Sequence, residues 1–165
     1  MKSLKLIRHF KPEGAGVFMG QNDPDLDAAP LSIPHINVDV AITSPLKRAK
    51  QSAALIFGDA NFSVNEAFAE ICYGQWDGKS WQEIERQWPE IAAAKMDNWL
   101  GITPPGGESW NDFSSRVLKA FKEIESTDAS IAILAHAGVN SVINHYLTGE
   151  DPLDFTQEFG EVIEY

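Results

Sequence analysis

Two apolar runs of this chain end in side chains that could bind or attack an anionic group. Arg8 and His9 follow the run 4–7, and His136 follows the run 131–135. A cationic or imidazole side chain at the end of a buried strand costs free energy unless it is paired or used. Taken singly, each histidine could equally be a satisfied structural residue at a strand end. The recurrence of the pattern favours a shared site.

A third stretch adds another arginine in a comparable position. After the expected strand 38–43, Ser44 and Pro45 resemble the N-cap and the first residue of a helix. Arg48 then lies about one turn into that helix, where free backbone N–H groups already favour an anion. A guanidinium adds a two-pronged donor for phosphate or carboxylate. We therefore expect Arg48 to clamp an anion without supporting the core.

The elements that must position these residues alternate between strands and helices. Parallel strands would bring Arg8, His9, Arg48 and His136 to one sheet edge, because ligands of open α/β sheets bind outside the carboxyl ends of the strands. We predict one domain over 1–165, a three-layer α/β/α fold with a mainly parallel open sheet. The expected strands are 3–8, 38–43, 62–64, 130–135 and an edge strand at 160–165. The expected helices are 45–57, 81–88, 91–100, one that begins after Ser109, and 138–147.

Five ordered stretches carry a family resemblance. They are Leu6-Ile7-Arg8-His9, Ser44 to Ala53 (SPLKRAKQSA), Glu70 to Gly78 (EICYGQWDG), Pro105 to Ser109 (PGGES) and His136 to Val139 (HAGV). With these motifs the chain resembles the histidine phosphatase superfamily, the phosphoglycerate-mutase-like proteins. The pattern is most similar to small phosphatases of the α-ribazole phosphatase type.

The resemblance implies a role for each matching residue. His9 would be the nucleophile that forms a phosphohistidine, and Glu70 would protonate the departing alcohol. Arg8, Arg48 and His136 would hold the phosphoryl oxygens, with His136 part of the catalytic group. Without the resemblance, Glu70 would be interpreted as a solvated surface acid. A glutamate with an ordinary pKa of about 4.3 is ionised at pH 7, so burial or substrate phosphate must raise the pKa of Glu70.

Three further residues are expected to border the substrate: Asn22, Glu108 and Ser109. All five tryptophans lie between Trp76 and Trp110, a region that overhangs the phosphate site in the family that the chain resembles. They could form a local aromatic core, or one or two could line an apolar substrate pocket.

Three departures from the family pattern leave alternatives open. Relatives usually have glycine where this chain has Phe10, and relatives with mutase activity have asparagine where it has Gly16. The crossover loop, residues 13–34, lacks the helix that relatives usually carry before the second strand, so a second copy of the chain could cover that sheet face as a homodimer.

The predicted function is hydrolysis of a small-molecule phosphate monoester through the phosphohistidine. The alternatives are a phosphoglycerate-type mutase and a non-catalytic domain that binds a phosphate ligand.

Composition narrows the classes of partner and cofactor. The 165 residues carry a net charge of −11, which argues against nucleic acid or an anionic membrane as partners. No apolar run approaches a membrane span, and the single cysteine allows no internal disulfide, so we expect a cytoplasmic protein. No His, Cys, Asp and Glu cluster has metal-ligand spacing, so we expect no catalytic metal and no other cofactor.

Overall fold

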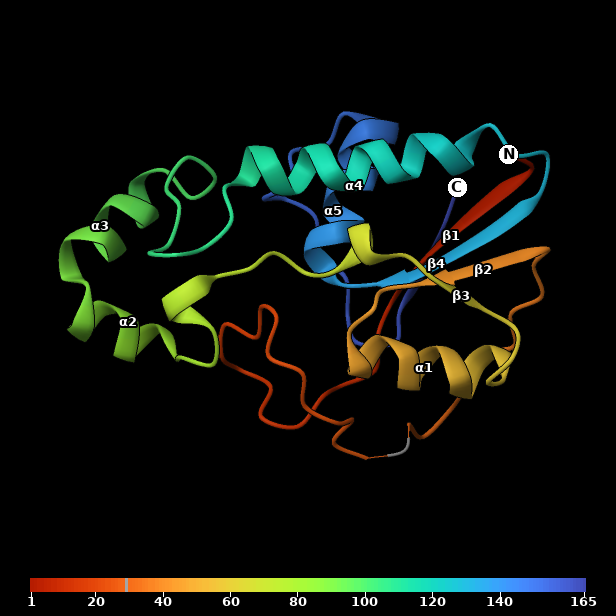
Figure 1. Ribbon diagram of the computed structural model, residues 1–165, viewed down its shortest axis with the longest axis horizontal. Helices are drawn as coiled ribbons and strands as arrows, with labels where there is room; N and C mark the ends of the chain where they lie inside the picture. The colour runs from red at the N-terminus through yellow and green to blue at the C-terminus, as the bar shows by residue number, and fades with distance from the viewer. Residues whose placement is uncertain (29) are drawn as a thin grey trace.

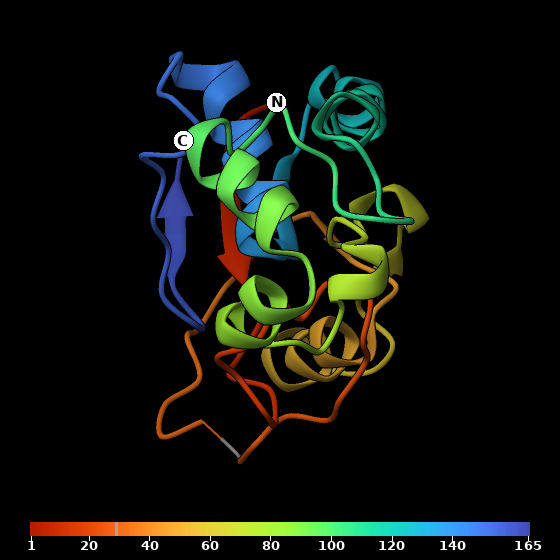
Figure 2. The same ribbon diagram turned by 90° about the vertical axis from the view of Figure 1, so that its left-hand side faces the viewer.

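The computed structural model describes residues 1–28 and 30–165 and contains a mixed five-stranded sheet. The strand order is β3-β2-β4-β1-β5, and every pairing is parallel except that of β5 with β1. The bounds are β1 Ser3–Arg8, β2 Val40–Thr43, β3 Ser63–Val64, β4 Ser130–Ala135 and β5 Val162–Glu164. Figure 2 shows the β5 arrow running opposite to β1 at the sheet edge.

Helices cover both faces of this sheet (Figure 1). Helices α4 (Trp110–Glu125) and α5 (Ala137–Thr148) lie on one face, and α1 (Lys47–Phe57) lies on the other. The larger core cluster joins Leu4 and Leu6 to Phe113 and Phe121 of α4, whereas Ile7 faces the α1 side. Alternation along β1 thus sends successive side chains to opposite layers. The three-layer, mainly parallel fold predicted from the sequence is confirmed.

A lobe projects beyond the carboxyl ends of the strands (Figure 1). It contains α2 (Trp81–Gln87), α3 (Pro89–Asp97) and the short 3-10 helix η2 (Gly74–Trp76). A second 3-10 helix, η1 (Glu66–Phe68), precedes the lobe in the chain. Its own cluster is centred on Trp76, Ile84 and Ala92. We call this segment, residues 74–100, the aromatic lobe.

The chain between β1 and β2 contains no helix in residues 9–28 and 30–39, as the sequence predicts. Hydrogen bonds hold this loop to α1 instead. Gln51 accepts from the Leu26 backbone N–H at 3.0 Å and donates to Asp25, while the Asp23 carboxylate accepts from the backbone N–H of Lys47. Polar contacts therefore replace helix packing as the support of the crossover loop.

Three predicted helix starts differ from the structure: α3 begins at Pro89 and not at 91, α5 begins at Ala137 and not at 138, and α1 begins later than 45. Helix α1 begins at Lys47, and Leu46 occupies the N-cap position without a side-chain cap. Ser44 lies upstream of the cap, and its hydroxyl has a different contact, described below. At α4 the predicted cap is present, because the Ser109 Oγ accepts from the backbone N–H of Asp112 at 3.1 Å.

Candidate active site

Three parallel strands deliver the predicted anion-binding residues to one edge of the sheet. Arg8 pairs in register with Ala135 at the end of β4, and Thr43 pairs with Leu134. The next residues in the chain, His9, Ser44 and His136, therefore leave the sheet side by side. The imidazoles of His9 and His136 lie 5.0 Å apart between ring centres.

The hydrogen bonds of His9 fix which nitrogen can attack an electrophile. Its Nδ1 lies 2.6 Å from the carbonyl oxygen of Phe10, and a carbonyl can only accept, so Nδ1 carries the proton. Its Nε2 is then unprotonated and accepts from Nε of Arg48 at 3.3 Å. The pKa of His9 is lowered to about 3, mainly by burial; the Phe10 carbonyl raises it, and the charges of Arg48 and Arg8 add to the lowering. The imidazole is thus neutral and nucleophilic at neutral pH.

Arg48 has a second task that the sequence did not reveal. The side chain is only 1% exposed, and its two terminal nitrogens donate to the carbonyl oxygens of Gly20, at 2.8 Å, and Asn22. The guanidinium therefore ties the crossover loop to the nucleophile. Arg48 was expected to clamp an anion without supporting the core; the structure adds contacts to the crossover loop, and the anion-binding role stays a prediction.

Arg8 reaches the same edge from β1 and is held by the C-terminal segment. It donates to the carbonyl oxygen of Gln157 at 2.5 Å, and its guanidinium carbon lies 3.9 Å from the centre of the Phe159 ring. The same ring lies 5.5 Å from that of His9. Nε of Arg8 is buried with no hydrogen-bond partner among the described residues, which leaves a donor for a bound oxygen.

His136 is fully buried, and Ser44 orients its ring. Nε2 of His136 lies 2.7 Å from the hydroxyl oxygen of Ser44, and that oxygen accepts from the backbone N–H of Leu46 at 3.2 Å. With one lone pair used in this way, the hydroxyl can donate its proton to Nε2. In that arrangement Nδ1 of His136, which lacks a partner among the described residues, carries the ring proton. Burial, then the neighbouring His9 and arginine charges, hold the pKa of His136 well below its usual range.

Glu70 faces this cluster from the chain between η1 and η2. Its two carboxyl oxygens accept from the backbone N–H groups of Ile71, at 3.0 Å, and Gly138, at 3.3 Å. Burial raises the pKa of Glu70 despite these N–H groups and the nearby Arg48 and Arg8. A Cβ atom on Gly138 would lie 2.4 Å from a Glu70 oxygen. Glycine at 138 thus lets the N-terminus of α5 approach the carboxyl.

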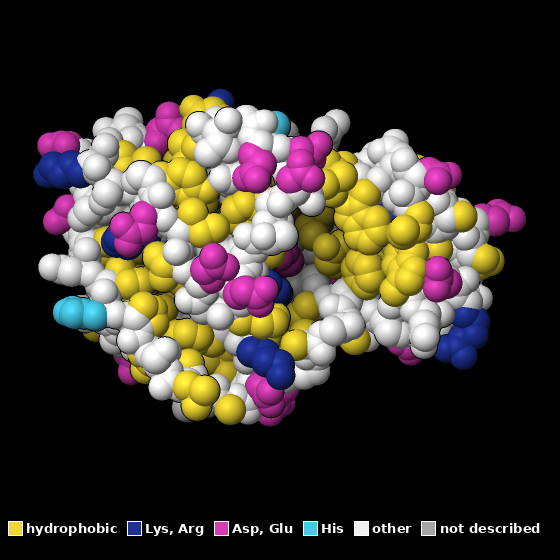
Figure 3. Space-filling view, turned by 180° about the vertical axis from the view of Figure 1, so that it is seen from behind, with side chains coloured by type: hydrophobic (Ala, Val, Ile, Leu, Met, Phe, Trp, Pro, Cys, Tyr) yellow, Lys and Arg dark blue, Asp and Glu magenta, His cyan; other side chains and the backbone are white. Residues whose placement is uncertain are grey.

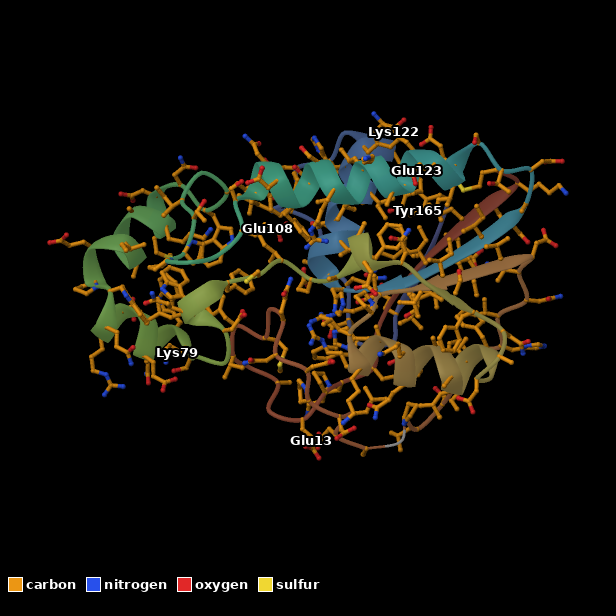
Figure 4. All side chains as sticks on the ribbon, viewed as in Figure 1. Glu13, Lys79, Glu108, Lys122, Glu123 and Tyr165 are labelled. Atoms are coloured by element: carbon orange, nitrogen blue, oxygen red, sulfur yellow. The ribbon has the colours of Figure 1, made fainter. Side chains whose placement is uncertain are left out.

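The structure does not bring Glu108 and Ser109 to the site, contrary to their predicted role as substrate contacts. Glu108 lies where the chain enters α4 (Figure 4) and pairs with Arg116, with Nε 2.7 Å from Oε1. Arg116 also donates to the carbonyl oxygens of Ala67, Ala69 and Glu70. Ser109 caps α4. The ion pair of Glu108 with Arg116 therefore braces the segment that presents Glu70.

Asn22 and Phe10 also differ from expectation. The backbone carbonyl of Asn22 accepts a hydrogen bond from Arg48. The side chain of Asn22 lies against Gly78 and does not line the cavity described below. Phe10, where relatives usually have glycine, is buried and packs beside Gly160, where an added Cβ would lie 2.8 Å from the ring. The chain therefore accommodates Phe10 away from the cavity.

A cavity of about 520 Å³ opens over the cluster. Arg8, His9, Arg48 and Glu70 form its polar end. The other lining residues come from the crossover loop and its start, the aromatic lobe and its approach, α5 and the C-terminal segment: Pro12, Ala15, Gly16, Val17, Phe18, Met19, Gly20, Tyr73, Trp81, Ala137, Gly138 and Phe159. Figure 3 shows a hollow where the lobe meets the body, with hydrophobic side chains gathered on the lobe side.

Two kinds of feature are absent from the described part of the chain. Residues 1–28 and 30–165 contain no group of three or more His, Cys, Asp or Glu side chains arranged to hold a metal ion. Within the same residues, no helix combines the length and the apolar character needed to cross a bilayer.

Comparisons with known proteins agree with this geometry. The model of the histidine phosphatase superfamily (branch 1) matches residues 4–160. A 2,3-bisphosphoglycerate-dependent phosphoglycerate mutase of Bartonella tribocorum is 30% identical over 133 residues, which cover 70% of this chain and 65% of the mutase. The chain thus spans a little less than two thirds of that relative. The adenosylcobalamin/alpha-ribazole phosphatase of Escherichia coli is 24% identical over 160 residues, 88% of this chain and 79% of the relative.

Solved structures share the fold. The alpha-ribazole phosphatase from Shigella flexneri superimposes with a TM-score of 0.84 at 22% identity, over 98% of this chain and 89% of that one.

Sequence reasoning missed two residues that shape the site. Ser44 had a local signal, but it was interpreted as a helix cap. Phe159 had no signal at all, because it reaches Arg8 and His9 from the far end of the chain.

Proposed function

Because the chain belongs to the histidine phosphatase superfamily, we propose that it hydrolyses a small-molecule phosphate monoester through a phosphohistidine at His9. The observation that carries this proposal is the hydrogen bond between Nδ1 of His9 and the carbonyl oxygen of Phe10. A ring whose Nδ1 proton is bound by the Phe10 carbonyl, and whose pKa is low, presents an unprotonated Nε2 to the cavity.

The first chemical step transfers the phosphoryl group to the protein. The lone pair of His9 Nε2 gives up the hydrogen bond from Nε of Arg48 and forms a bond to phosphorus, while the bond from phosphorus to the alcohol oxygen breaks. Arg8, Arg48 and the Nδ1–H of His136 stabilise the charge on the phosphoryl oxygens. Glu70, whose raised pKa favours the protonated form, gives its proton to the departing alcohol.

The second step restores the resting protein. Water attacks phosphorus, the N–P bond breaks, and inorganic phosphate leaves. The Glu70 carboxylate takes the proton from that water, so His9 returns to its neutral form and Glu70 to its acid form. Atoms and charges balance over the cycle without another reactant.

The charges of the cavity favour hydrolysis over a mutase reaction. A bisphosphorylated sugar acid would need cations beyond those that hold the first phosphate. Among the described residues that line the cavity, the cationic side chains are Arg8 and Arg48, and both lie at the polar end beside His9. A second anionic group would therefore enter without a counter-charge.

The test is to trap the intermediate. Brief reaction with a ³²P-labelled aryl phosphate, in the presence of a strong chelator, should label the protein in an acid-labile, alkali-stable form that is typical of phosphohistidine. The variant His9→Asn should show neither label nor phosphate release. Label transferred back to substrate faster than phosphate is released would support the mutase instead. Tight binding of phosphate without turnover by the unmutated protein would support the non-catalytic alternative.

A further inference from the structure

The cavity is divided into a polar end and a long apolar remainder. The groups that would engage a phosphoryl group occupy one end, and the other walls are mainly apolar side chains from three parts of the chain. A volume of about 520 Å³ lies within the range of sites for drug-sized ligands and leaves room beyond a single phosphate. The apolar remainder therefore faces the alcohol portion of an ester whose phosphate lies at His9.

Aromatic rings build the wall on the lobe side. Trp81 lines the cavity, and its ring centre lies 5.8 Å from that of Trp99 and 6.0 Å from those of Phe18 and Trp76. Phe18 also packs edge-on against Tyr73, with ring centres 5.0 Å apart. Tilted and edge-on pairs at these separations are favourable for aromatic rings. Phe18 and Trp81 are thus held in place by neighbours and do not depend on a ligand for their position.

Among the described residues, the lining of the cavity holds no cation beyond Arg8 and Arg48 that could bind a second anion. An adjoining surface pocket shares Val17 and Met19 with the cavity and carries Glu13 and Asp23. Glu13 lies on the outer side of the crossover loop (Figure 4). The lysine nearest to the aromatic wall in sequence, Lys79, lies over Trp88 at 6.0 Å and does not line the cavity. A carboxylate or second phosphate on the alcohol would therefore enter the apolar remainder without a counter-charge.

We infer that the preferred substrate is a phosphate monoester whose alcohol carries a flat, uncharged, apolar ring and no second anionic group. This inference rests on the proposed function for the place of the phosphate. Phe18 and Trp81 receive the ring, and a sugar-acid phosphate would place its carboxylate among apolar side chains without a counter-charge.

Binding of non-hydrolysable phosphonates tests the inference without any reaction. The probes are 3-phenylpropylphosphonate, propylphosphonate and 3-phosphonopropionate, which differ in a ring or a carboxylate. By calorimetry, the phenyl compound should bind about 10–100-fold more tightly than the propyl compound, the gain expected for burying one aromatic ring. The carboxylate compound should bind no more tightly than the propyl compound. Equal binding of the phenyl and propyl compounds, or tighter binding of the carboxylate compound, would overturn the inference.

Two tryptophan variants locate the effect. Trp81→Ala should reduce the phenyl-to-propyl affinity ratio by at least about 5-fold, because it removes an apolar wall. Trp88→Ala is the matched control, since Trp88 belongs to the same cluster but does not line the cavity; it should leave the ratio within about 2-fold. If Trp81→Ala does not fold, the affinities of the three probes are compared in Trp81→Phe and in the unmutated protein. An unchanged ratio in a folded Trp81→Ala protein would refute the placement of the ring.

Turnover is measured separately, with 2-phenylethyl phosphate. Absence of turnover together with the expected phosphonate order would refute the proposed hydrolysis but not the ligand class. Turnover together with the reverse order would refute the ligand class but not the hydrolysis.

Discussion

Replacing Arg48 with alanine should damage both the stability of the fold and the chemistry. The buried guanidinium donates to the carbonyl oxygens of Gly20 and Asn22. A hydrogen bond to a charged group contributes about 1.5–3 kcal/mol, although removal of the buried charge recovers part of its own desolvation. We therefore expect Arg48→Ala to lower the free energy of unfolding by about 2–4 kcal/mol, measured by urea denaturation with an unchanged m-value.

Turnover of the same variant should fall further than its stability alone explains. One well-placed electrostatic donor is worth about 10²–10³ in kcat, and Arg48 also contacts the attacking Nε2 of His9. The assay is kcat for an aryl phosphate at a temperature where urea denaturation shows the variant to be folded. Arg48→Lys keeps the charge but loses the fork, so both effects should be intermediate.

Lys47→Ala provides the matched control. Lys47 holds the same loop from outside, through an ion pair with Asp25 at 2.6 Å in which both side chains are about half exposed. An exposed pair contributes about 0–1 kcal/mol, and Lys47 does not line the cavity, so kcat should not change. If folded Arg48→Ala keeps kcat within about 10-fold of the unmutated protein, Arg48 only anchors the loop. If stability is unchanged, the two carbonyl contacts contribute nothing and the double role is refuted.

Three further predictions concern the other groups of the site. Glu70→Gln should slow hydrolysis of an alkyl phosphate about 10²–10⁴-fold and that of 4-nitrophenyl phosphate much less, because nitrophenolate leaves without a proton; equal losses would mean that Glu70 is not the acid. Ser44→Ala should lower kcat about 5–10-fold, because His136 loses its orienting hydrogen bond and such a bond contributes about 1 kcal/mol. Ser44→Thr keeps the hydroxyl and should retain the rate. Burial holds the pKa of His9 at about 3, below its value of about 6.5 in the unfolded chain. Between these two pH values the unfolded chain binds more protons than the folded one. The free energy of unfolding should therefore fall as the pH decreases from about 6.5 toward about 3. His9→Gln should therefore reduce the difference in stability between pH 7 and pH 5 in urea denaturation, and the exposed His35→Gln should leave it as it is.

The sheet edge was predictable because it depends on local patterns. Apolar runs that end at Arg8 and His136 are buried strands, and parallel pairing aligns their carboxyl ends. The same reasoning correctly expected a crossover without a helix in residues 13–28 and 30–34. Hydrophobic alternation and strand direction were sufficient at these positions.

Contacts between distant segments were not predictable. Ser44 precedes a proline, so a cap was the favoured local interpretation, yet its hydroxyl contacts His136, which is 92 positions away. Arg48 donates to backbone carbonyls, and a carbonyl has no sequence signature. As a carboxylate, Glu108 could have been a site residue. Arg116, two helical turns along α4, forms an ion pair with it instead.

The crossover loop connects the chemistry to the choice of substrate. Its residues Val17, Phe18 and Met19 form part of the apolar wall, and its carbonyl oxygens at 20 and 22 bind the guanidinium of Arg48. A crossover with a helix would be positioned by packing, whereas this loop depends on hydrogen bonds, which tolerate little displacement of the donor. Because that donor also contacts His9, movement of the loop would displace both the proposed phosphate-binding groups and the wall proposed to receive the ring. Substitutions in the loop should therefore alter ligand preference and turnover jointly, even where the substituted residue touches neither the phosphate nor the alcohol.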